Sequence, residues 1–310
     1  QALGELTRYP DGNGFALKSA LAQRCGVQVS QVTLGNGSND ILELVARAYL
    51  APGLNAVFSE HAFAVYPIVT QAVGADAHVV PAKAFGHDLD AMLAAIDAQT
   101  RVVFIANPNN PTGTWFGPQE LVAFLSQVPE SVLVVLDEAY IEYAEGDELP
   151  DGLTYLARYP NLLVSRTFSK AYGLAALRVG YGICSAQIAD VLNRVRQPFN
   201  VNSLALAAAC AALADSDYLA ASRTVNDQGM AQLEAGFRQL GLSWIASKAN
   251  FIAVDLGCEA MPIFQALLRE GVIVRPVANY GMPTYLRISI GLPAENARFL
   301  EALAKVLPRG

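Results

Sequence analysis

The amino-acid sequence predicts an α/β protein, with a large domain built on a mainly parallel sheet and a smaller α+β domain. Over residues 1–200, short apolar runs that end in polar residues alternate with segments of helical spacing. After that point the pattern changes to a long alanine-rich helix, followed by separate strands and helices. The chain of 310 residues is 53% hydrophobic and 16% charged, so it can bury a large core.

Six runs have the composition of strands that are buried on both faces, which are nearly unbroken in apolar residues. They are AVFSE (56–60), HVVPA (78–82), RVVFIANP (101–108), SVLVVLDEAY (131–140), NLLVSRTFS (161–169) and VGYGICS (179–185). LDAMLAAIDA (89–98) and PQELVAFLSQV (118–128) carry helical spacing between them. Ligands in such sheets bind beyond the carboxyl ends of the strands, so the polar residues there are candidates for a site.

The C-terminal part is predicted to begin with one helix over residues 203–240. The later elements are a strand at 249–256, a helix at 261–271, strands at 272–277 and 285–291, and a helix at 293–307. We therefore expect a large cofactor-binding domain of residues 30–240. The small domain is expected to combine residues 1–29 with residues 241–310.

Composition also limits the partners and the location. The formal net charge is −7 and no basic run appears, so nucleic acid is not an expected partner. No apolar run reaches the length of about 18 residues that a membrane-spanning helix needs. The four cysteines form no C-x-x-C pair, the three histidines lack metal-ligand spacing, and no signal-peptide pattern opens the chain. We expect reduced thiols, no metal site, no membrane association and a cytoplasmic protein.

The stretch GNGSND, residues 35–40, follows a short predicted strand and opens a helix whose apolar residues share one face. Glycines before a helix N-terminus allow backbone N–H groups to surround an anion, and the helix dipole favours negative charge there. The alternative is that Ser38 only caps the helix. The stretch is not a dinucleotide-binding motif, because the third glycine of that motif is absent. It is not a Walker motif either, because no Walker lysine follows.

Two further polar stretches follow predicted strands. In NPNNPTG, residues 107–113, two prolines and a glycine fix a rigid turn, where asparagine side chains can donate an amide N–H to a bound oxygen. An ordinary turn is the alternative. Asp137 in LDEAY, residues 136–140, ends the most hydrophobic strand, where a carboxylate is costly without a positive or donor partner. Alternatively, Asp137 caps the next helix.

The stretch SRTFSKAYGLAALRVGY, residues 165–181, places Ser169 directly before Lys170 and Arg178 eight residues later, in small and apolar company. With the other motifs it offers an anion cradle, a rigid asparagine, an acid at a strand end, a tyrosine and an amine. A phosphorylated, positively chargeable aromatic aldehyde would use all of these groups. Pyridoxal 5′-phosphate has that chemistry.

Six motifs in order give a resemblance that covers nearly the whole chain. They are RYPDGNGFALKSALA (8–22), GNGSNDILEL (35–44), ANPNNPTG (106–113), LDEAY (136–140), SRTFSKAYGLAALRVGY (165–181), and GVIVRP with YLRISIG (271–276 and 285–291). The sequence resembles the fold-type-I pyridoxal-phosphate-dependent aminotransferases, and specifically the histidinol-phosphate aminotransferase family. The resemblance implies pyridoxal 5′-phosphate as cofactor. It also implies conversion of histidinol phosphate and 2-oxoglutarate to imidazole acetol phosphate and glutamate, a step of histidine biosynthesis.

The resemblance further implies a role for each matched residue around the cofactor ring. Lys170 would form the Schiff base, and Asp137 would contact the pyridine nitrogen. Asn110 and Tyr140 would contact the 3-oxygen of the ring, and Tyr140 would also be a catalytic residue. Phe63 would stack on the ring. Lysine attacks an aldehyde only as a neutral amine, so partial burial and a nearby cation, which lower its pKa, suit this role.

The resemblance implies that the remaining residues bind the cofactor phosphate or a substrate anion, and that one of them reaches a second subunit. The residues implied to hold the cofactor phosphate are Ser38, Asn39, Thr167, Ser169 and Arg178. Tyr9 resembles a tyrosine that reaches the phosphate of the neighbouring subunit, which implies a homodimer. Arg287 resembles the arginine that holds a substrate carboxylate or phosphate, and Arg275 is expected to supply a second cation.

Three functional hypotheses remain open at this point. The first is histidinol-phosphate transamination. The second, with the same cofactor, is an aromatic amino acid aminotransferase or a lyase similar to threonine-phosphate decarboxylase. The third is a non-enzymatic regulator that fuses this fold to a DNA-binding domain. It is disfavoured because no helix-turn-helix segment or basic patch precedes the motifs.

Overall fold

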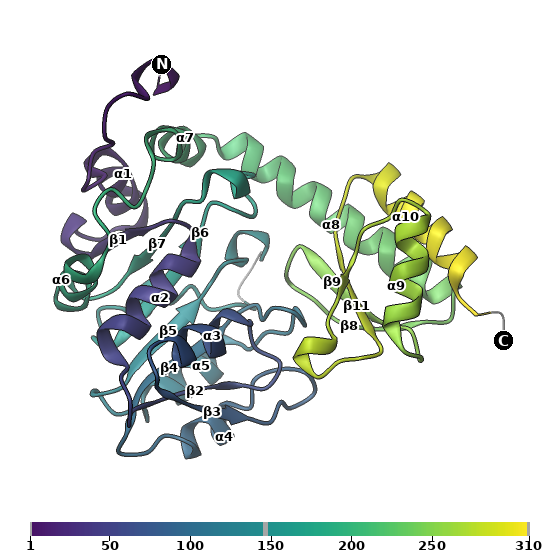
Figure 1. The fold of residues 1–310 in the computed structure, drawn as a ribbon, viewed down its shortest axis with the longest axis horizontal. Helices are drawn as coiled ribbons and strands as arrows, with labels where there is room; N and C mark the ends of the chain where they lie inside the picture. The colour runs from purple at the N-terminus through teal and green to yellow at the C-terminus, as the bar shows by residue number, and fades with distance from the viewer. Residues whose placement is uncertain (1, 145–147, 309–310) are drawn as a thin grey trace.

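The computed structural model describes residues 2–144 and 148–308, which form two sheets with their own helices. The larger sheet lies at the left of Figure 1 and the smaller one at the right, and helix α8 (Ser216–Gln239) runs between them. This arrangement of a large α/β part and a smaller α+β part is the predicted fold class.

The large sheet has seven strands in the order β1-β7-β6-β5-β4-β2-β3. Their bounds are β1 Val32–Gly35, β2 Asn55–Ser59, β3 Asp76–Val80, β4 Thr100–Ala106, β5 Leu133–Asp137, β6 Leu162–Thr167 and β7 Gly180–Ile183. Neighbours from β3 to β6 pair in parallel, whereas β7 pairs antiparallel with both β6 and β1. All six predicted strands exist, but β3 lies at an edge and is mostly exposed, so the expectation of burial on both faces is wrong for it.

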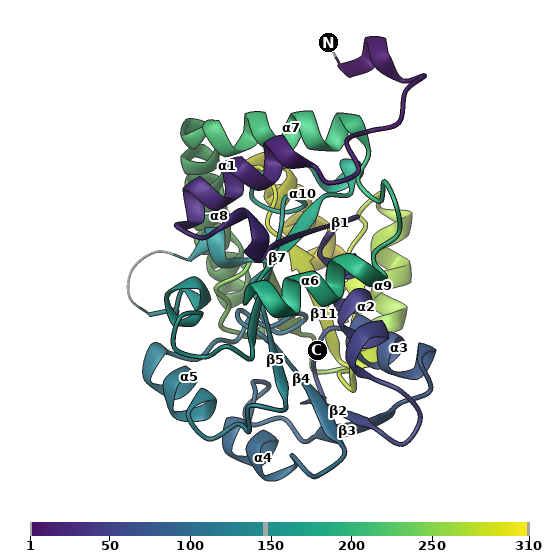
Figure 2. The same cartoon turned by 90° about the vertical axis from the view of Figure 1, so that its left-hand side faces the viewer.

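Helices cover both faces of this sheet, as Figure 2 shows. One core cluster combines the sheet with α2 (Ser38–Tyr49), α3 (Val65–Ala72) and α6 (Ala186–Val195). The other combines it with α1 (Phe15–Cys25), α4 (Leu89–Ala94), α5 (Pro118–Leu125) and α7 (Ser203–Ala214). Because apolar side chains are buried on both faces, the central strands carry the continuous apolar runs that the sequence shows.

The N-terminal helix corrects the expected grouping of residues 1–29 with the small domain. Leu17 and Leu21 on α1 are buried in the core cluster of the large sheet, together with Ala205 and Ala209 of α7. An amphipathic helix joins the surface that buries its apolar stripe, and for α1 that surface belongs to the large sheet. Both views show α1 beside α7, and Figure 1 shows both helices away from the small sheet.

The predicted single helix over residues 203–240 is two helices, α7 and α8, bent by 80° at Asp215. The side chain of Asp215 accepts a hydrogen bond from the backbone N–H of Tyr218, which caps the new helix. No single described helix is long and apolar enough to cross a membrane, although the bent α7–α8 pair meets the length and composition criteria together.

The small sheet has four antiparallel strands in the order β10-β11-β9-β8. Its elements are β8 Ser243–Ile245, β9 Phe251–Asp255, α9 Ala260–Arg269, β10 Arg275–Pro276, β11 Tyr285–Ser289 and α10 Pro293–Val306. Leu233 and Phe237 of α8 are buried in its core. The second half of α8 therefore packs with the small domain, and the expected boundary at residue 240 lies too late in the chain.

Short 3₁₀ helices complete the chain. They are η1 Ala2–Glu5, η2 Val29–Gln31, η3 Ile141–Tyr143, η4 Gly152–Tyr155, η5 Ala175–Leu177 and η6 Ala278–Tyr280. The two domains touch at η6, where the backbone oxygen of Tyr280 lies 2.6 Å from Nδ1 of His61.

Candidate active site

A cavity of about 160 Å³ lies beyond the carboxyl ends of β4, β5 and β6. It is lined by Ser38, Asn39, Phe63, Ala106, Pro108, Asn110, Asp137, Ala139, Tyr140, Thr167, Ser169, Lys170 and Arg178. The structure thus brings together the ten residues of this chain that were assigned to the cofactor, leaving aside Tyr9. Nine of them come from four of the motifs above and Phe63 comes from the stretch HAFAVY (61–66), and the parallel strands carry three of the motifs to one edge of the sheet.

The turn between β1 and α2 forms one wall of the cavity. Gly37 has a φ of +80°, which strains any other residue, and a Cβ there would displace the guanidinium of Arg178. The carboxylate of Asp40 accepts a 2.8 Å hydrogen bond from the backbone N–H of Asn36 and holds the turn. Helix α2 begins at Ser38 and its N-cap is Gly37, so the alternative that Ser38 caps the helix is wrong.

Residues after β6 form the neighbouring wall through a short chain of hydrogen bonds. Thr167 Oγ1 lies 3.0 Å from Ser169 Oγ, which accepts a 3.2 Å bond from Nη1 of Arg178. Arg178 has a φ of +56°, and its Nη1 also donates to the carbonyl of Ala175 at 3.0 Å. Two hydroxyls and one guanidinium therefore face the first turn of α2, whose N-terminus favours negative charge.

Asp137 closes β5 with a carboxylate that is only 4% exposed. Its Oδ2 accepts a 3.0 Å hydrogen bond from the hydroxyl of Tyr66, while its Oδ1 is buried and has no hydrogen-bond partner among the described residues. Burial raises the pKa of Asp137 to about 6, although Tyr66, the Ala139 backbone and Lys170 each act to lower it. The carboxylate is thus held in place with one oxygen ready for a donor.

Lys170 is half-buried and also lines the cavity. Its Nζ lies 5.2 Å from the centre of the Tyr140 ring. Burial lowers the pKa of Lys170, and the positive charges of Arg287 and Arg178 lower it further, while Asp137 acts in the opposite direction. These causes increase the fraction of neutral amine, which is the nucleophilic form.

The three asparagines of the turn at residues 107–113 make different contacts. Asn107 exchanges hydrogen bonds with the backbone of Phe116, and Asn109 donates to the carbonyl of His61 at 2.8 Å. Asn110 instead lines the cavity, and its Oδ1 accepts a hydrogen bond from Nη1 of Arg287 in the small domain. The rigid turn thus presents one amide to the cavity.

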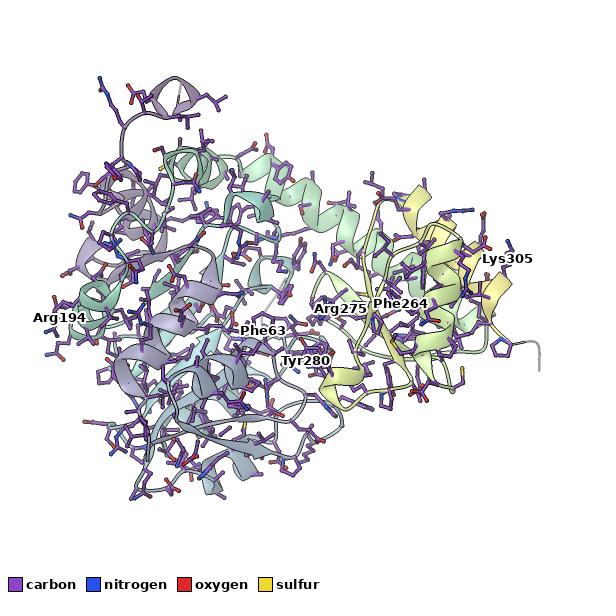
Figure 3. All side chains as sticks on the ribbon, viewed as in Figure 1. Phe63, Arg194, Phe264, Arg275, Tyr280 and Lys305 are labelled. Carbon is purple, nitrogen blue, oxygen red and sulfur yellow. The ribbon has the colours of Figure 1, made fainter. Side chains whose placement is uncertain are left out.

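Arg287 on β11 reaches from the small domain to the edge of the cavity. Its guanidinium lies 4.8 Å from the centre of the Phe251 ring, and its Nε is buried without a hydrogen-bond partner among the described residues. Arg275 on β10 is its register partner in the small sheet and is exposed. Figure 3 shows Arg275 at the end of the small domain nearest the large one, with Phe63 across the boundary.

Tyr9 lies apart from the cavity of its own chain. It is 84% exposed and stacks on Phe199, with 4.8 Å between the ring centres. Figures 1 and 2 show the segment before α1 projecting from the body of the molecule. Within one chain, the structure does not bring Tyr9 to the other predicted site residues.

Sequence reasoning missed Tyr66, which supports the cavity from behind. The side chain is fully buried near the start of α3, which begins two residues after Phe63, and its hydroxyl reaches Asp137. A spacing of three residues would place Phe63 and Tyr66 on one side of a helix, although α3 begins only at Val65, and a buried tyrosine needs a partner for its hydroxyl. That signal was available in HAFAVY, but it does not name the partner.

Comparison with known proteins agrees with this geometry. The model of the family described as "Aminotransferase class I and II" matches residues 1–303. Histidinol-phosphate aminotransferase 2 of Pseudomonas fluorescens Pf-5 is 83% identical over 99% of this chain and 83% of its own length. The protein of the same name from Pseudomonas aeruginosa is 80% identical over 98% of the chain and 83% of its length.

A solved structure shares the fold over nearly the whole chain. It is the histidinol-phosphate aminotransferase of Sinorhizobium meliloti in complex with pyridoxal-5′-phosphate, with 33% identity and a TM-score of 0.94. The match covers 99% of this chain and 84% of that one.

Proposed function

The chain belongs to the class I and II aminotransferases and, within them, to the histidinol-phosphate aminotransferases, and we propose that it moves an amino group from histidinol phosphate to 2-oxoglutarate. It is an enzyme that depends on pyridoxal phosphate. When bound, this cofactor supplies an aromatic electron sink for the charge left when a substrate carbon loses its proton.

The buried Oδ1 of Asp137 is the observation that carries the proposal. A buried carboxylate oxygen without a partner is costly, and here it belongs to a residue that lines a cavity together with an amine and an anion cradle. The protonated nitrogen of a pyridine ring is a donor that fits this oxygen. Asp137 would hold that nitrogen in its protonated form, which strengthens the ring as an electron sink.

The first turn of α2 and the end of β6 are proposed to hold the cofactor phosphate. The residues proposed for this are Ser38, Asn39, Thr167, Ser169 and Arg178. Backbone N–H groups at the start of a helix such as α2 are available to an anion, and the helix dipole favours negative charge there. Arg178 adds a planar fork of donors, and the close approach of Gly37 to this guanidinium supports the arrangement.

Lys170 is proposed to bind the cofactor aldehyde and then to move a proton. Its lowered pKa supports attack by the neutral amine. Once the substrate amine replaces it, Nζ would take the proton from the substrate carbon that bears the amine and return it at the neighbouring cofactor carbon. Tyr140 and Asn110 are proposed to contact the ring oxygen, and Phe63 to stack on the ring.

The substrates are proposed to be held by cations of the small domain. Histidinol phosphate and 2-oxoglutarate each carry an anion away from the reacting centre, and one guanidinium can hold either with parallel hydrogen bonds. Arg287 supports this because it reaches the cavity beside Asn110 and Lys170. Arg275, its neighbour across the β10–β11 ladder, would be the second cation.

We further propose a homodimer in which Tyr9 reaches the phosphate of the partner chain. Several large apolar side chains around the N-terminal segment are exposed: Leu3, Leu6, Tyr9, Phe15 and Phe199. Exposed apolar groups gathered in one region favour burial by a partner, and a second copy of this chain is the proposed one. The four cysteines are free thiols, which supports the proposed cytoplasmic location.

Single-turnover absorbance measurements test the proposed substrate. Loaded enzyme is mixed separately with histidinol phosphate, phenylalanine and threonine phosphate, and the cofactor spectrum is followed. We expect conversion to the amine form of the cofactor to be fastest with histidinol phosphate. Faster conversion with phenylalanine would favour the aromatic aminotransferase alternative, and release of CO₂ from threonine phosphate would favour the lyase.

A further inference from the structure

Tyr66 is one of the largest fully buried side chains, and it contacts the cavity residue Asp137 without lining the cavity itself. Its ring stacks on Phe104 of β4, with 4.9 Å between centres and 7° between planes. Its backbone lies on α3, where the Tyr66 carbonyl accepts a hydrogen bond from the hydroxyl of Thr70 at 2.8 Å. The strand and the helix together fix the position of this ring.

The hydroxyl of Tyr66 donates to Oδ2 of Asp137 at 3.0 Å. Burial and the Asp137 charge raise the pKa of Tyr66 well above its ordinary value, so the phenol remains a donor at neutral pH. Asp137 therefore has one oxygen fixed by Tyr66 and one oxygen, Oδ1, that is buried without a hydrogen-bond partner among the described residues. Without the hydroxyl, the carboxylate could rotate, and it would be a stronger base.

The ring of Tyr66 also contacts Phe63, the residue proposed to stack on the cofactor ring. Tyr66 and Phe63 pack edge to face, with 5.9 Å between the ring centres and 89° between the ring planes. Such edge-to-face pairs are favourable and constrain the orientation of both rings. One side chain thus touches both the proposed nitrogen partner, Asp137, and the proposed stacking residue, Phe63.

We propose that Tyr66 is a positioning residue that orients Asp137 through its hydroxyl and Phe63 through its ring. This inference rests on the cofactor placement proposed above. The hydroxyl stabilises the carboxylate form of Asp137, so the shared proton stays on the pyridine nitrogen and not on the acid. The two effects are separable, because Tyr66→Phe removes the hydroxyl alone and Tyr66→Leu removes the ring as well.

The test is the ¹⁵N chemical shift of the pyridine nitrogen in holoenzyme loaded with ¹⁵N-labelled cofactor, measured at one fixed pH. In Tyr66→Phe we expect the resonance to move from the protonated toward the neutral value. We also expect kcat to fall about 10-fold, with KM changed by less than about 3-fold. In Tyr66→Leu the dissociation constant of the cofactor should rise a further 10-fold or so, because Phe63 loses its support.

Tyr159→Phe is the matched control, because the Tyr159 hydroxyl is also buried but belongs to a different core cluster. This control should retain the native ¹⁵N shift and kcat. A double-mutant cycle adds a second readout, since Tyr66→Phe should have little further effect in an Asp137→Asn background. If Tyr66→Phe does not fold, 3-fluorotyrosine at position 66 keeps the shape and strengthens the donor, and it should move the resonance in the opposite direction.

The results of these experiments distinguish an error in the proposed role of Asp137 from an error in the proposed role of Tyr66. A neutral pyridine nitrogen in the native holoenzyme would overturn the proposed role of Asp137 itself. A protonated nitrogen that is unchanged in Tyr66→Phe, or unchanged with fluorotyrosine, would leave that role intact and overturn the role of Tyr66. Additive losses in the double-mutant cycle would also overturn it, because Tyr66 would then act independently of Asp137.

Discussion

Replacing Asp137 with asparagine is expected to stabilise the cofactor-free chain while it removes most of the turnover of the loaded enzyme. Burial raises the pKa of this acid from 3.8 to about 6. Because the pKa is raised in the folded state, the stability linked to this group is fully present below pH 3.8 and is lost as the pH rises through about 6. Above that range the folded chain contains the ionised, buried carboxylate of Asp137, which is poorly stabilised when no cofactor is bound.

The size of the effect follows from the two pKa values. A shift from 3.8 to about 6 corresponds to about 3 kcal/mol of lost stability, since one pKa unit is worth about 1.4 kcal/mol. Asparagine would leave one buried amide group without a partner, which costs about 1 kcal/mol. The apo Asp137→Asn variant should therefore be more stable than the native chain by about 2 kcal/mol near pH 8, and by little near pH 4.5.

Urea unfolding of both apo proteins at the two pH values measures this difference. Asp76→Asn, which changes an exposed acid on the edge strand β3, is the control and should show no such pH-dependent gain. Loaded Asp137→Asn should lose turnover by about 10²-fold or more, because the ring nitrogen loses the partner that keeps it protonated. An apo variant that is equally or less stable near pH 8 would refute the account of an uncompensated buried carboxylate.

Three other changes test the remaining parts of the site. Lys170→Ala should abolish the visible absorbance band of the bound cofactor and reduce turnover by at least about 10³-fold, and a variant that kept both would remove Lys170 from its role. Arg287→Ala should erase most of an expected preference of about 10²-fold in kcat/KM for histidinol phosphate over histidinol, whereas an undiminished preference would place the phosphate elsewhere. Tyr9→Ala should weaken cofactor binding in the assembled dimer, and sedimentation of the native protein as a fully active monomer would contradict the shared site.

The central strands and most of the residues that line the cavity could be predicted from the sequence, although Ala106, Pro108 and Ala139 were not among the predicted ones. Strands β4, β5 and β6 are buried on both faces and so have continuous apolar runs, and each is followed by a polar segment. Parallel pairing then brings those segments to one edge, where Asp137 and Lys170 lie. The edge strand β3 escaped this reasoning, because its apolar composition resembles that of a buried strand although most of it faces solvent.

Longer-range packing could not be predicted from local patterns. Alanine-rich sequence continues through the α7–α8 junction, so the bend of 80° depends on how each helix packs and on the cap at Asp215. The place of α1 was also ambiguous, since an apolar stripe does not identify the surface that will bury it. Tyr66 was missed for the same reason, because its contact with Asp137 joins residues 71 positions apart.

Transfer of labelled nitrogen tests the central proposal most directly. Purified enzyme loaded with cofactor is incubated with histidinol phosphate labelled with ¹⁵N in its amino group and with unlabelled 2-oxoglutarate. Transamination predicts one labelled glutamate for each imidazole acetol phosphate formed. Glutamate that remains unlabelled, with the label retained in the donor or released as ammonia, would contradict it.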